Sequence, residues 1–333
     1  MKLSIIILCW NDLKVIGPCL QSIYASTRST EFEVIVSDNG STDGSIEYIH
    51  KEFPQVQVIE NRANLRFAKG NNVGIQASRG QYVLILNPDT IIHDGTLDNL
   101  VQYADRHPEG GAFGCRVLNA DGSFQGCIRP LHTLRSMWCQ ALYLGWLAHL
   151  FDWFHPGIYV NWKGETERTV GWLAGCFILV RGDLLKRLGG FDERFFYYYE
   201  DTDLCRRIWE SGFPILYTPD FTIIHLGGQS TITRFDRLTF ALDGEITRYL
   251  YVHKYYGANG LRSCRRANLV GLTLRRLGYG FLALVRPSEA IKQRRKLLRA
   301  LFEWNYRVDP VRLVEKGEEP RLASTSVVRL LER

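Results

Sequence analysis

The sequence predicts an α/β protein, in which helices flank a mostly parallel sheet and a helical extension follows at the C-terminal end. Up to about residue 115, strand-like and helix-like segments alternate, which is typical of parallel strands joined by helices. Three apolar segments end in polar residues, and ligands of such sheets bind where the strands end. Beyond about residue 236 the pattern is helical.

The first part of the chain contains four expected strands, each followed by an expected helix. The strands are 3–8, 33–37, 56–60 and 82–86. The helices are 15–25, 45–51, 68–77 and 95–106. Residues 119–123 then indicate a hairpin turn, because their Asp-Gly pair tolerates the positive φ that such turns need.

The segment 131–162 differs in composition because it is rich in aromatic residues. Its longest uncharged stretch, Ser136–Leu147, is too short to cross a bilayer, which takes ~20 apolar residues. Two interpretations stay open. The segment forms either a helix that lies on the α/β domain or a wedge at a membrane interface.

The α/β pattern returns after this segment. Strand-like stretches are 170–180, 214–218 and 222–225, and helix-like stretches are 182–188 and 201–211. We therefore expect an α/β domain over 1–235 that carries the insertion 131–162, a basic helical region over 236–310, and a polar, mobile tail over 311–333.

The charge is unevenly distributed along a chain whose net charge is +6. Residues 262–299 contain eleven Lys and Arg against the single acidic Glu289, so the rest of the chain is net negative. A basic segment on an acidic body indicates an anionic partner, either phospholipid or nucleic acid, with a merely solvated helix face as the alternative. The apolar helix expected at Leu269–Val285, interrupted by arginines, favours a membrane surface and no nucleic acid.

Eight scattered cysteines, with no C-x-x-C pair and no zinc-like spacing, predict free thiols in a reducing compartment. The N-terminal apolar run Leu3–Trp10 is short and has no small-residue cleavage site. It predicts a first strand, so a signal peptide is not expected and the predicted location is the cytoplasm.

The motif Asn87-Pro88-Asp89 follows the apolar strand 82–86. A carboxylate at a strand end can hold a divalent cation against a phosphate, and Mg²⁺ and Mn²⁺ prefer such oxygen ligands. A simple Pro-Asp turn is the alternative. His225 ends another apolar strand and could complete a metal site with Asp89.

Two further loops indicate a nucleotide. Asp38 ends the strand 33–37, where its carboxylate can accept from a base N–H or a ribose hydroxyl, while Asp43 suits a helix cap. The loop 61–74 places Arg66, Lys69 and Gly70 near a helix start, which favours phosphate. An ordinary capped loop is the alternative.

An acidic cluster stands at the start of the helix expected at 201–211. A carboxylate there can act as a general base if an acceptor hydroxyl reaches it. The alternative for Asp201 is a helix cap. Asp203 is expected to pair with Arg206 or Arg207 along the helix.

These motifs, taken together and in this order over about residues 3–230, resemble the family 2 inverting glycosyltransferases of GT-A fold. Within that family the chain looks most like the bacterial rhamnosyltransferases that build cell-surface polysaccharide. The resemblance implies a nucleotide-diphospho-sugar donor, with dTDP-rhamnose as the predicted one, and Mg²⁺ or Mn²⁺. It also implies a lipid-linked glycan acceptor and a peripheral location on the inner face of the cytoplasmic membrane.

The resemblance also implies roles for particular residues. Asp38 would bind the base, Asp89 and His225 the metal, and Asp201, paired with Glu200, would be the base of a single displacement. The rest of the nucleotide-sugar pocket would comprise Cys9, Asn11, Asn64, Phe67, Gly70, Asn71 and Asn87. Donor sugar and acceptor would face Trp172, Gly175 and Cys176.

Two positions depart from the family pattern. Asn87 replaces the first acidic residue of the D-x-D-type motif, so metal binding depends on fewer charges. Arg66 stands where relatives often have glycine, which affects the conformation expected for that loop.

Three alternatives stay open. A UDP-hexose or UDP-galactofuranose transferase would have the same fold. A non-catalytic nucleotide-sugar-binding scaffold at the membrane should have lost Asp89 or Asp201, and this chain keeps both. A dinucleotide-dependent oxidoreductase should have G-x-G-x-x-G after its first strand, and this chain lacks it.

Overall fold

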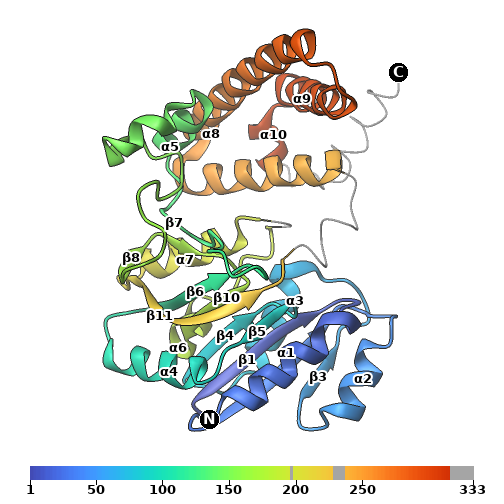
Figure 1. Ribbon diagram of the computed structural model, residues 1–333, viewed down its shortest axis with the longest axis vertical. Coiled ribbons are helices and arrows are strands. Elements are labelled where there is room, and N and C mark those ends of the chain that lie inside the picture. Colours follow the sequence, from blue (N-terminus) through green and yellow to red (C-terminus); the bar gives the residue numbers. More distant parts are fainter. Residues whose placement is uncertain (196–197, 228–236, 316–333) are drawn as a thin grey trace. The chain divides into compact units, whose positions relative to one another are not determined.

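The computed structural model describes residues 1–195, 198–227 and 237–315 (Figure 1). The chain forms two compact units. The first comprises 1–131, 162–196 and 200–234, and the second comprises 132–161, 197–199 and 235–333. The aromatic segment thus belongs to the second unit, whereas the sequence-based division kept it within 1–235.

The N-terminal half of the first unit has the predicted alternation of strands and helices. Its strands are β1 (Leu3–Cys9), β2 (Phe32–Asp38), β3 (Gln57–Glu60) and β4 (Tyr82–Leu86). Its helices are α1 (Leu13–Ser26), α2 (Ser45–Glu52) and α3 (Arg66–Ala77). Each predicted boundary lies within two residues of the observed one.

The C-terminal half of this unit contains more and shorter strands. They are β5 (Thr90–Ile92), β6 (Ala112–Leu118), β7 (Ile128–Arg129), β8 (Arg168–Val170), β9 (Trp172–Leu173), β10 (Phe177–Arg181) and β11 (Ile215–His225). The helices are α4 (Thr96–Arg106), α6 (Gly182–Arg187) and α7 (Glu200–Glu210). The predicted hairpin at 119–123 forms, with Gly122 at φ +79°.

The main sheet has the strand order β3-β2-β1-β4-β10-β6-β11-β5, and β8 pairs with β11. β1 runs parallel to both β2 and β4, β2 runs parallel to β3, and β6 to β11. β10 is antiparallel to its two neighbours. The mostly parallel sheet with flanking helices is therefore confirmed (Figure 1).

The register brings the predicted strand ends to one edge. Cys9 at the end of β1 is paired with Asp38 at the end of β2. Ile7 is paired with Leu86, the last residue of β4. β1 and β4 are buried along almost their whole length, as expected for strands covered on both faces.

The stretch 170–180 forms three strands where the sequence predicted one. A side chain at Gly171 would begin 2.0 Å from the backbone nitrogen of Leu131, so this close approach requires glycine. The following β9 leaves the main sheet and pairs with β7. Conversely, the two strands predicted at 214–218 and 222–225 form the single strand β11, whose register shifts between Tyr217 and Thr222.

The second unit is helical. It contains α5 (Leu134–Ala141), the 3₁₀ turns η1 (Leu144–His149) and η2 (Asp152–Phe154), and helices α8 (Arg237–Val285), α9 (Glu289–Arg307) and α10 (Pro310–Glu315). Gly257, at φ +64°, interrupts α8. Helix α5 packs on α8, where the Trp138 indole donates to Ser263 Oγ at 3.0 Å. Helix α5 of the aromatic segment thus packs on α8, whereas Tyr143, Trp146, Phe151 and Trp153 further along the segment are exposed.

Helix α10 changes the predicted start of the tail, because 311–315 are helical and Leu313 is buried. The rest of the predicted tail, and the predicted boundary at 235–236, lie outside the described residues. No helix in the described ranges is long and apolar enough to cross a membrane.

Candidate active site

The loops that follow β1 and β2 are joined by hydrogen bonds. The buried Asp38 carboxylate accepts from the backbone nitrogens of Gly40, at 2.9 Å, and Ser41, at 3.1 Å. Asn11, at φ +57°, accepts from Thr42 N at 2.6 Å and donates its own backbone N–H to Ser41 Oγ at 2.8 Å. The Cys9 sulfur lies 3.8 Å from that same oxygen. Cys9, Asn11 and Asp38 therefore lie together where β1 and β2 end.

A ladder of amide side chains connects this loop to the start of α3. Asn64 Oδ1 accepts from Arg66 N at 2.9 Å and from Asn39 Nδ2 at 3.3 Å. Asn61 Nδ2 donates to Ser37 Oγ at 2.9 Å and to Asn39 Oδ1 at 3.2 Å. Sequence analysis assigned no role to Asn39 and Asn61, although each follows the end of a strand.

Arg66 has a left-handed backbone, at φ +69°. Glycine adopts this conformation without steric cost, whereas other L-residues are strained by roughly 1–2 kcal/mol. Arg66, which stands where relatives often have glycine, therefore occupies a position whose backbone conformation suits glycine. The loop adopts this conformation although the residue is arginine.

Helix α3 lies close to β1. A side chain at Gly70 would begin 2.4 Å from Leu8 Cδ1, so a larger residue there would force Leu8 to shift. The Phe67 ring lies against Gly175, where an added Cβ would be 2.8 Å from the ring. Asn71 Nδ2 donates to Phe67 O at 2.9 Å, and Asn71 Oδ1 is buried with no donor in the described part of the chain.

Asp89 and His225 lie together, as predicted. His225 Nε2 is 3.2 Å from Asp89 Oδ1 and 3.2 Å from Asn87 Nδ2. The other ring nitrogen, Nδ1, is 2.7 Å from Gln125 Oε1. Asp89 is 2% exposed, and no described residue donates a well-aligned hydrogen bond to its Oδ1.

Gln125 and Cys127 complete the surroundings of His225, and sequence analysis missed both. Burial disfavours the imidazolium, but interactions with Asp89 and Cys127 outweigh it and raise the pKa of His225 to about 9. The hydrogen bond between the two thiols lowers the pKa of Cys127 to about 6 and raises that of Cys176. Neither Gln125 nor Cys127 stands in a recognisable motif, so only the fold reveals them.

The loop Trp172–Cys176 connects the two predicted reactive motifs. Cys176 O accepts from Asn87 N at 3.0 Å. Gly175 N donates to Asp201 Oδ2 at 3.1 Å. Trp172 begins the loop on β9, where it is paired with Arg129.

Asp201 and Glu200 begin helix α7. Burial raises the pKa of Asp201, although hydrogen bonds from Gly175 and Thr202 oppose the effect. Burial and the neighbouring Asp201 raise the pKa of Glu200 to about 8. Asp203 instead forms the expected structural pair, because Arg207 Nε donates to its Oδ2 at 2.8 Å.

Asp89 and His225 suit a divalent cation. If Nδ1 carries the proton donated to Gln125, then Nε2 and the Asp89 carboxylate are two acceptors 3.2 Å apart. Such a pair repels unless a proton or a cation lies between its members. Carboxylate oxygen and imidazole nitrogen are both ligands that Mn²⁺ accepts, and the oxygen also suits Mg²⁺.

Comparisons with known proteins identify the family to which the chain belongs. Residues 4–154 match the model of glycosyl transferase family 2. The chain is 33% identical over 231 residues to the N-acetylglucosaminyl-diphospho-decaprenol L-rhamnosyltransferase of Mycobacterium tuberculosis, covering 65% of this chain and 74% of that relative. It is 27% identical over 166 residues to rhamnosyltransferase WbbL of Escherichia coli, covering 48% of this chain and 60% of WbbL.

Solved structures agree in fold. The mannosyltransferase PcManGT from Pyrobaculum calidifontis, solved with GDP-Man and Mn²⁺, matches with a TM-score of 0.53 at 15% identity, covering 96% of this chain and 88% of that one. Staphylococcus aureus TarS 1–349, solved with UDP-GlcNAc, matches with a TM-score of 0.52 at 17% identity, covering 100% and 90%. The chain therefore has the GT-A fold and belongs to glycosyltransferase family 2, in the branch that contains the bacterial rhamnosyltransferases.

Proposed function

We propose that this enzyme transfers rhamnose from dTDP-rhamnose, with inversion, to a hydroxyl of a lipid-linked glycan. The main support for this proposal is the way in which the loop Trp172–Cys176 connects the candidate metal site to the candidate base. The loop is hydrogen-bonded to Asn87, beside the candidate metal ligand, and to Asp201, the candidate base. The sugar and the lipid-linked acceptor are taken from the name of the mycobacterial relative.

Asp201 is the proposed general base. Its carboxylate takes the proton of the acceptor hydroxyl, and that oxygen attacks the anomeric carbon from the face opposite the diphosphate. The Gly175 N–H fixes one carboxylate oxygen, which orients the side chain. Burial raises the pKa of Asp201, which makes its carboxylate a stronger base than an exposed one.

Asp89 and His225 are the proposed ligands of Mg²⁺ or Mn²⁺. A divalent cation bound there would neutralise charge on the leaving diphosphate. Asn87 Nδ2 lies 3.2 Å from His225 Nε2, so the Asn87 amide would turn away when that nitrogen binds the ion. PcManGT, with the same fold, was solved with Mn²⁺.

Asp38 is proposed to bind the base of the nucleotide. Its two oxygens already accept from the Gly40–Ser41 backbone, so the carboxylate is held in place before a donor arrives. The remaining nucleotide-sugar contacts are proposed for Cys9, Asn11, Asn64, Phe67, Gly70, Asn71 and Asn87. The donor sugar and the acceptor are proposed to meet Trp172, Gly175 and Cys176.

A thermal-shift panel followed by a transfer assay tests this function. UDP, dTDP, GDP and NAD would each be combined with Mn²⁺, Mg²⁺ or EDTA, because a ligand that binds the native state stabilises it. We expect a metal-dependent shift with dTDP. Transfer from dTDP-rhamnose to N-acetylglucosaminyl-diphospho-prenol should follow.

Each part of this proposal can fail separately. A shift with UDP alone, together with transfer from a UDP-sugar, would replace the rhamnose assignment by the UDP-hexose or UDP-galactofuranose alternative. Binding without transfer from any donor would favour the scaffold alternative. Asp89→Asn should abolish the metal dependence of the dTDP shift, and an unchanged dependence would remove Asp89 from the metal site.

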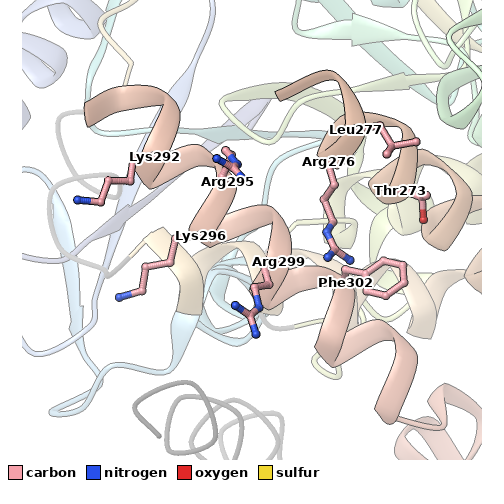
Figure 2. Close-up of a pocket in the computed structure, with 8 residues that line it drawn as sticks. All are labelled: Thr273, Arg276, Leu277, Lys292, Arg295, Lys296, Arg299 and Phe302. Carbon is pink, nitrogen blue, oxygen red and sulfur yellow. The ribbon is translucent and has the colours of Figure 1, made fainter. Parts of the chain in front are cut away.

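We also propose that the second unit docks on the inner face of the cytoplasmic membrane. Figure 2 shows the groove between α8 and α9, lined by five basic side chains. They are Arg276, Lys292, Arg295, Lys296 and Arg299. Exposed apolar side chains continue along the end of α8, among them Leu277, Phe281 and Leu284 at 67%, 70% and 83% exposure. Basic and apolar groups side by side suit an anionic bilayer surface.

Sedimentation with vesicles tests the docking. Arg295→Glu with Lys296→Glu should release the protein from phosphatidylglycerol vesicles, whereas the charge-matched control Arg106→Glu with Arg187→Glu, on the first unit, should stay bound. Equal sedimentation of both variants would contradict docking through this groove.

A further inference from the structure

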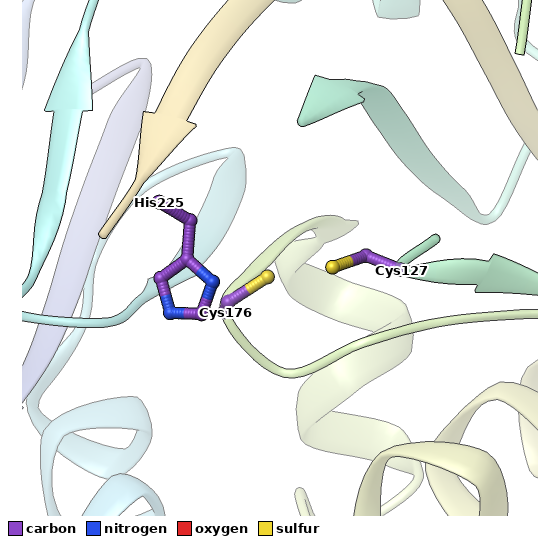
Figure 3. Close-up of side chains that lie close together, drawn as sticks. All are labelled: Cys127, Cys176 and His225. Atoms are coloured by element: carbon purple, nitrogen blue, oxygen red, sulfur yellow. The ribbon is translucent and has the colours of Figure 1, made fainter. Parts of the chain in front are cut away.

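Three side chains with soft or borderline metal-binding atoms meet beside the proposed catalytic cation. The Cys127 and Cys176 sulfurs and a His225 ring nitrogen all lie within 4.8 Å of one another. Figure 3 shows the two sulfurs and the imidazole converging from three separate segments. Cys127 precedes β7, Cys176 precedes β10, and His225 ends β11.

We propose that Cys127, Cys176 and His225 form a binding site for a thiophilic cation, with Zn²⁺ as its ligand. Thiolate and imidazole are the side chains that zinc prefers, whereas Mg²⁺ prefers oxygen. Zinc lies about 2.3 Å from sulfur and about 2.0–2.1 Å from nitrogen, so tetrahedral ligand atoms are roughly 3.3–3.8 Å apart. The three ligand atoms lie within 4.8 Å of one another, so binding requires them to approach by up to about 1.5 Å. Each thiol loses its proton to solvent as the ion binds.

The surroundings of His225 suit this role. Metal-binding imidazoles usually donate the other ring N–H to an oxygen acceptor, which fixes the ring. Asp89 Oδ1, 3.2 Å from Nε2, is such an acceptor, and it leaves Nδ1, the ring nitrogen on the side of the two sulfurs, for the ion (Figure 3). Gln125 Oε1, 2.7 Å from Nδ1 and 3.0 Å from Cys127 Sγ, offers an oxygen for the fourth position.

Cys127 and Cys176 are also held close together by the fold. Ala174 N donates to Cys127 O at 2.9 Å, so the strand end before β7 is joined to the Trp172–Cys176 loop. Cys176 is buried, while Cys127 is partly accessible and gives an ion access to the site. The backbone contact therefore keeps the two cysteine-bearing segments next to each other before an ion binds.

Zinc and the oxygen-preferring cation would exclude each other, because both would use His225. This consequence depends on the proposed function, whereas zinc binding itself does not. Zinc at the thiols would therefore inhibit transfer, and a chelator followed by Mn²⁺ or Mg²⁺ would restore it.

Cobalt substitution tests the site without any transfer assay. Co²⁺ would be titrated into the whole chain, kept reduced with a phosphine, because tetrahedral thiolate coordination gives intense visible bands and sulfur-to-metal charge transfer. We expect one equivalent to bind, Zn²⁺ to displace it, and excess Mg²⁺ to leave it in place. Cys127→Ser and Cys176→Ser should each lose the charge-transfer band. Cys264→Ser, a buried thiol of the helical unit, should keep it.

Alkylation of the wild-type protein gives a second measurement that needs no variant. Zn²⁺ should slow the reaction of Cys127 with iodoacetamide at least about tenfold, while Mg²⁺ should not, as mapped by mass spectrometry. Absence of cobalt charge transfer in the wild type, or bands in the two serine variants as intense as those of the wild type, would overturn the site. A normal dTDP shift in the same preparation would show that the proposed function survives that result.

Discussion

Two parts of the candidate site differ in how their buried polar atoms are hydrogen-bonded. The nucleotide side is formed by the loops that follow β1, β2 and β3, and the reaction side contains Asp89, His225, Glu200 and Asp201. On the nucleotide side, the Asp38 carboxylate and the Asn11 and Asn64 side-chain oxygens all accept hydrogen bonds from loop backbones. On the reaction side, Glu200 Oε2 is buried with no donor among the described residues, and Asp89 Oδ1 has only His225 Nε2, poorly aligned at 3.2 Å. The nucleotide side is therefore built in advance, whereas the reaction side keeps buried oxygens that a ligand can satisfy.

The difference has an energetic reason. A buried polar atom without a partner costs about 1–3 kcal/mol, so natural proteins keep few of them. Where such an atom belongs to a carboxyl group with a raised pKa, as Glu200 Oε2 does, a functional site is the expected explanation. Asn71 Oδ1 is the exception on the nucleotide side, and it is available to a ligand N–H.

The largest effect should come from the reaction side. Asp201→Asn removes the proposed base but keeps the side-chain size, so turnover should fall by about 10²–10⁴-fold while donor affinity changes little. Initial rates and a dTDP thermal shift would be measured on the same sample. Asp220→Asn, an exposed position, is the control. Turnover at the wild-type rate would refute the role of Asp201.

A substitution on the nucleotide side should lower the stability of the fold as well as nucleotide binding. Asp38→Ala leaves the backbone nitrogens of Gly40 and Ser41 without their charged acceptor, so the free energy of unfolding should fall by roughly 1.5–3 kcal/mol. Urea unfolding measures this change. Asp94→Ala, which breaks only an exposed pair with Arg28, should cost about 0–1 kcal/mol. Equal losses would contradict the contrast between the two positions.

Glu200 should make stability depend on pH. Its folded pKa of about 8 lies above its ordinary 4.5, so the native state holds the proton more tightly than the unfolded state. The stabilisation is complete below pH 4.5 and is lost as the pH rises through about 8. The glutamine of the Glu200→Gln variant does not titrate. The melting temperature of the variant minus that of the wild type should therefore be larger at pH 8.5 than at pH 5. An advantage that does not change with pH would show that Glu200 is ionised normally.

The smallest effect concerns the backbone at Arg66. Arg66→Gly and Arg66→Ala both remove the side chain, so their difference isolates the left-handed conformation. The glycine variant should be more stable than the alanine variant by about 1 kcal/mol, as read from urea midpoints. If alanine is as stable as glycine, then the loop relaxes out of the left-handed region.

Local patterns in the sequence predicted the parallel half of the sheet well. Long apolar runs such as Tyr82–Leu86 and the helices between them were located within two residues. The pairing of Asp203 with Arg207 was also predictable, because residues four apart share a helix face. Proximity of Asp89 and His225 was predicted from the family resemblance and is observed, while their binding of a metal stays a prediction.

Long-range contacts were not predictable in the same way. Gln125 and Cys127 lie about one hundred residues from His225 in the chain, and no local period relates them. The break at Gly171 depends on the nearby backbone of Leu131, and the place of α5 depends on its packing against α8.

Local periodicity and motifs were sufficient to predict the main strands and helices up to residue 106, the polar residues that follow the strands, and the family. Which polar atoms are satisfied, and which charges are buried together, became known only from the fold. It placed Cys127, Cys176 and His225 in one cluster from three distant segments. The physical reason is that hydrogen-bond satisfaction and desolvation depend on neighbours in space, which the fold brings together from across the chain.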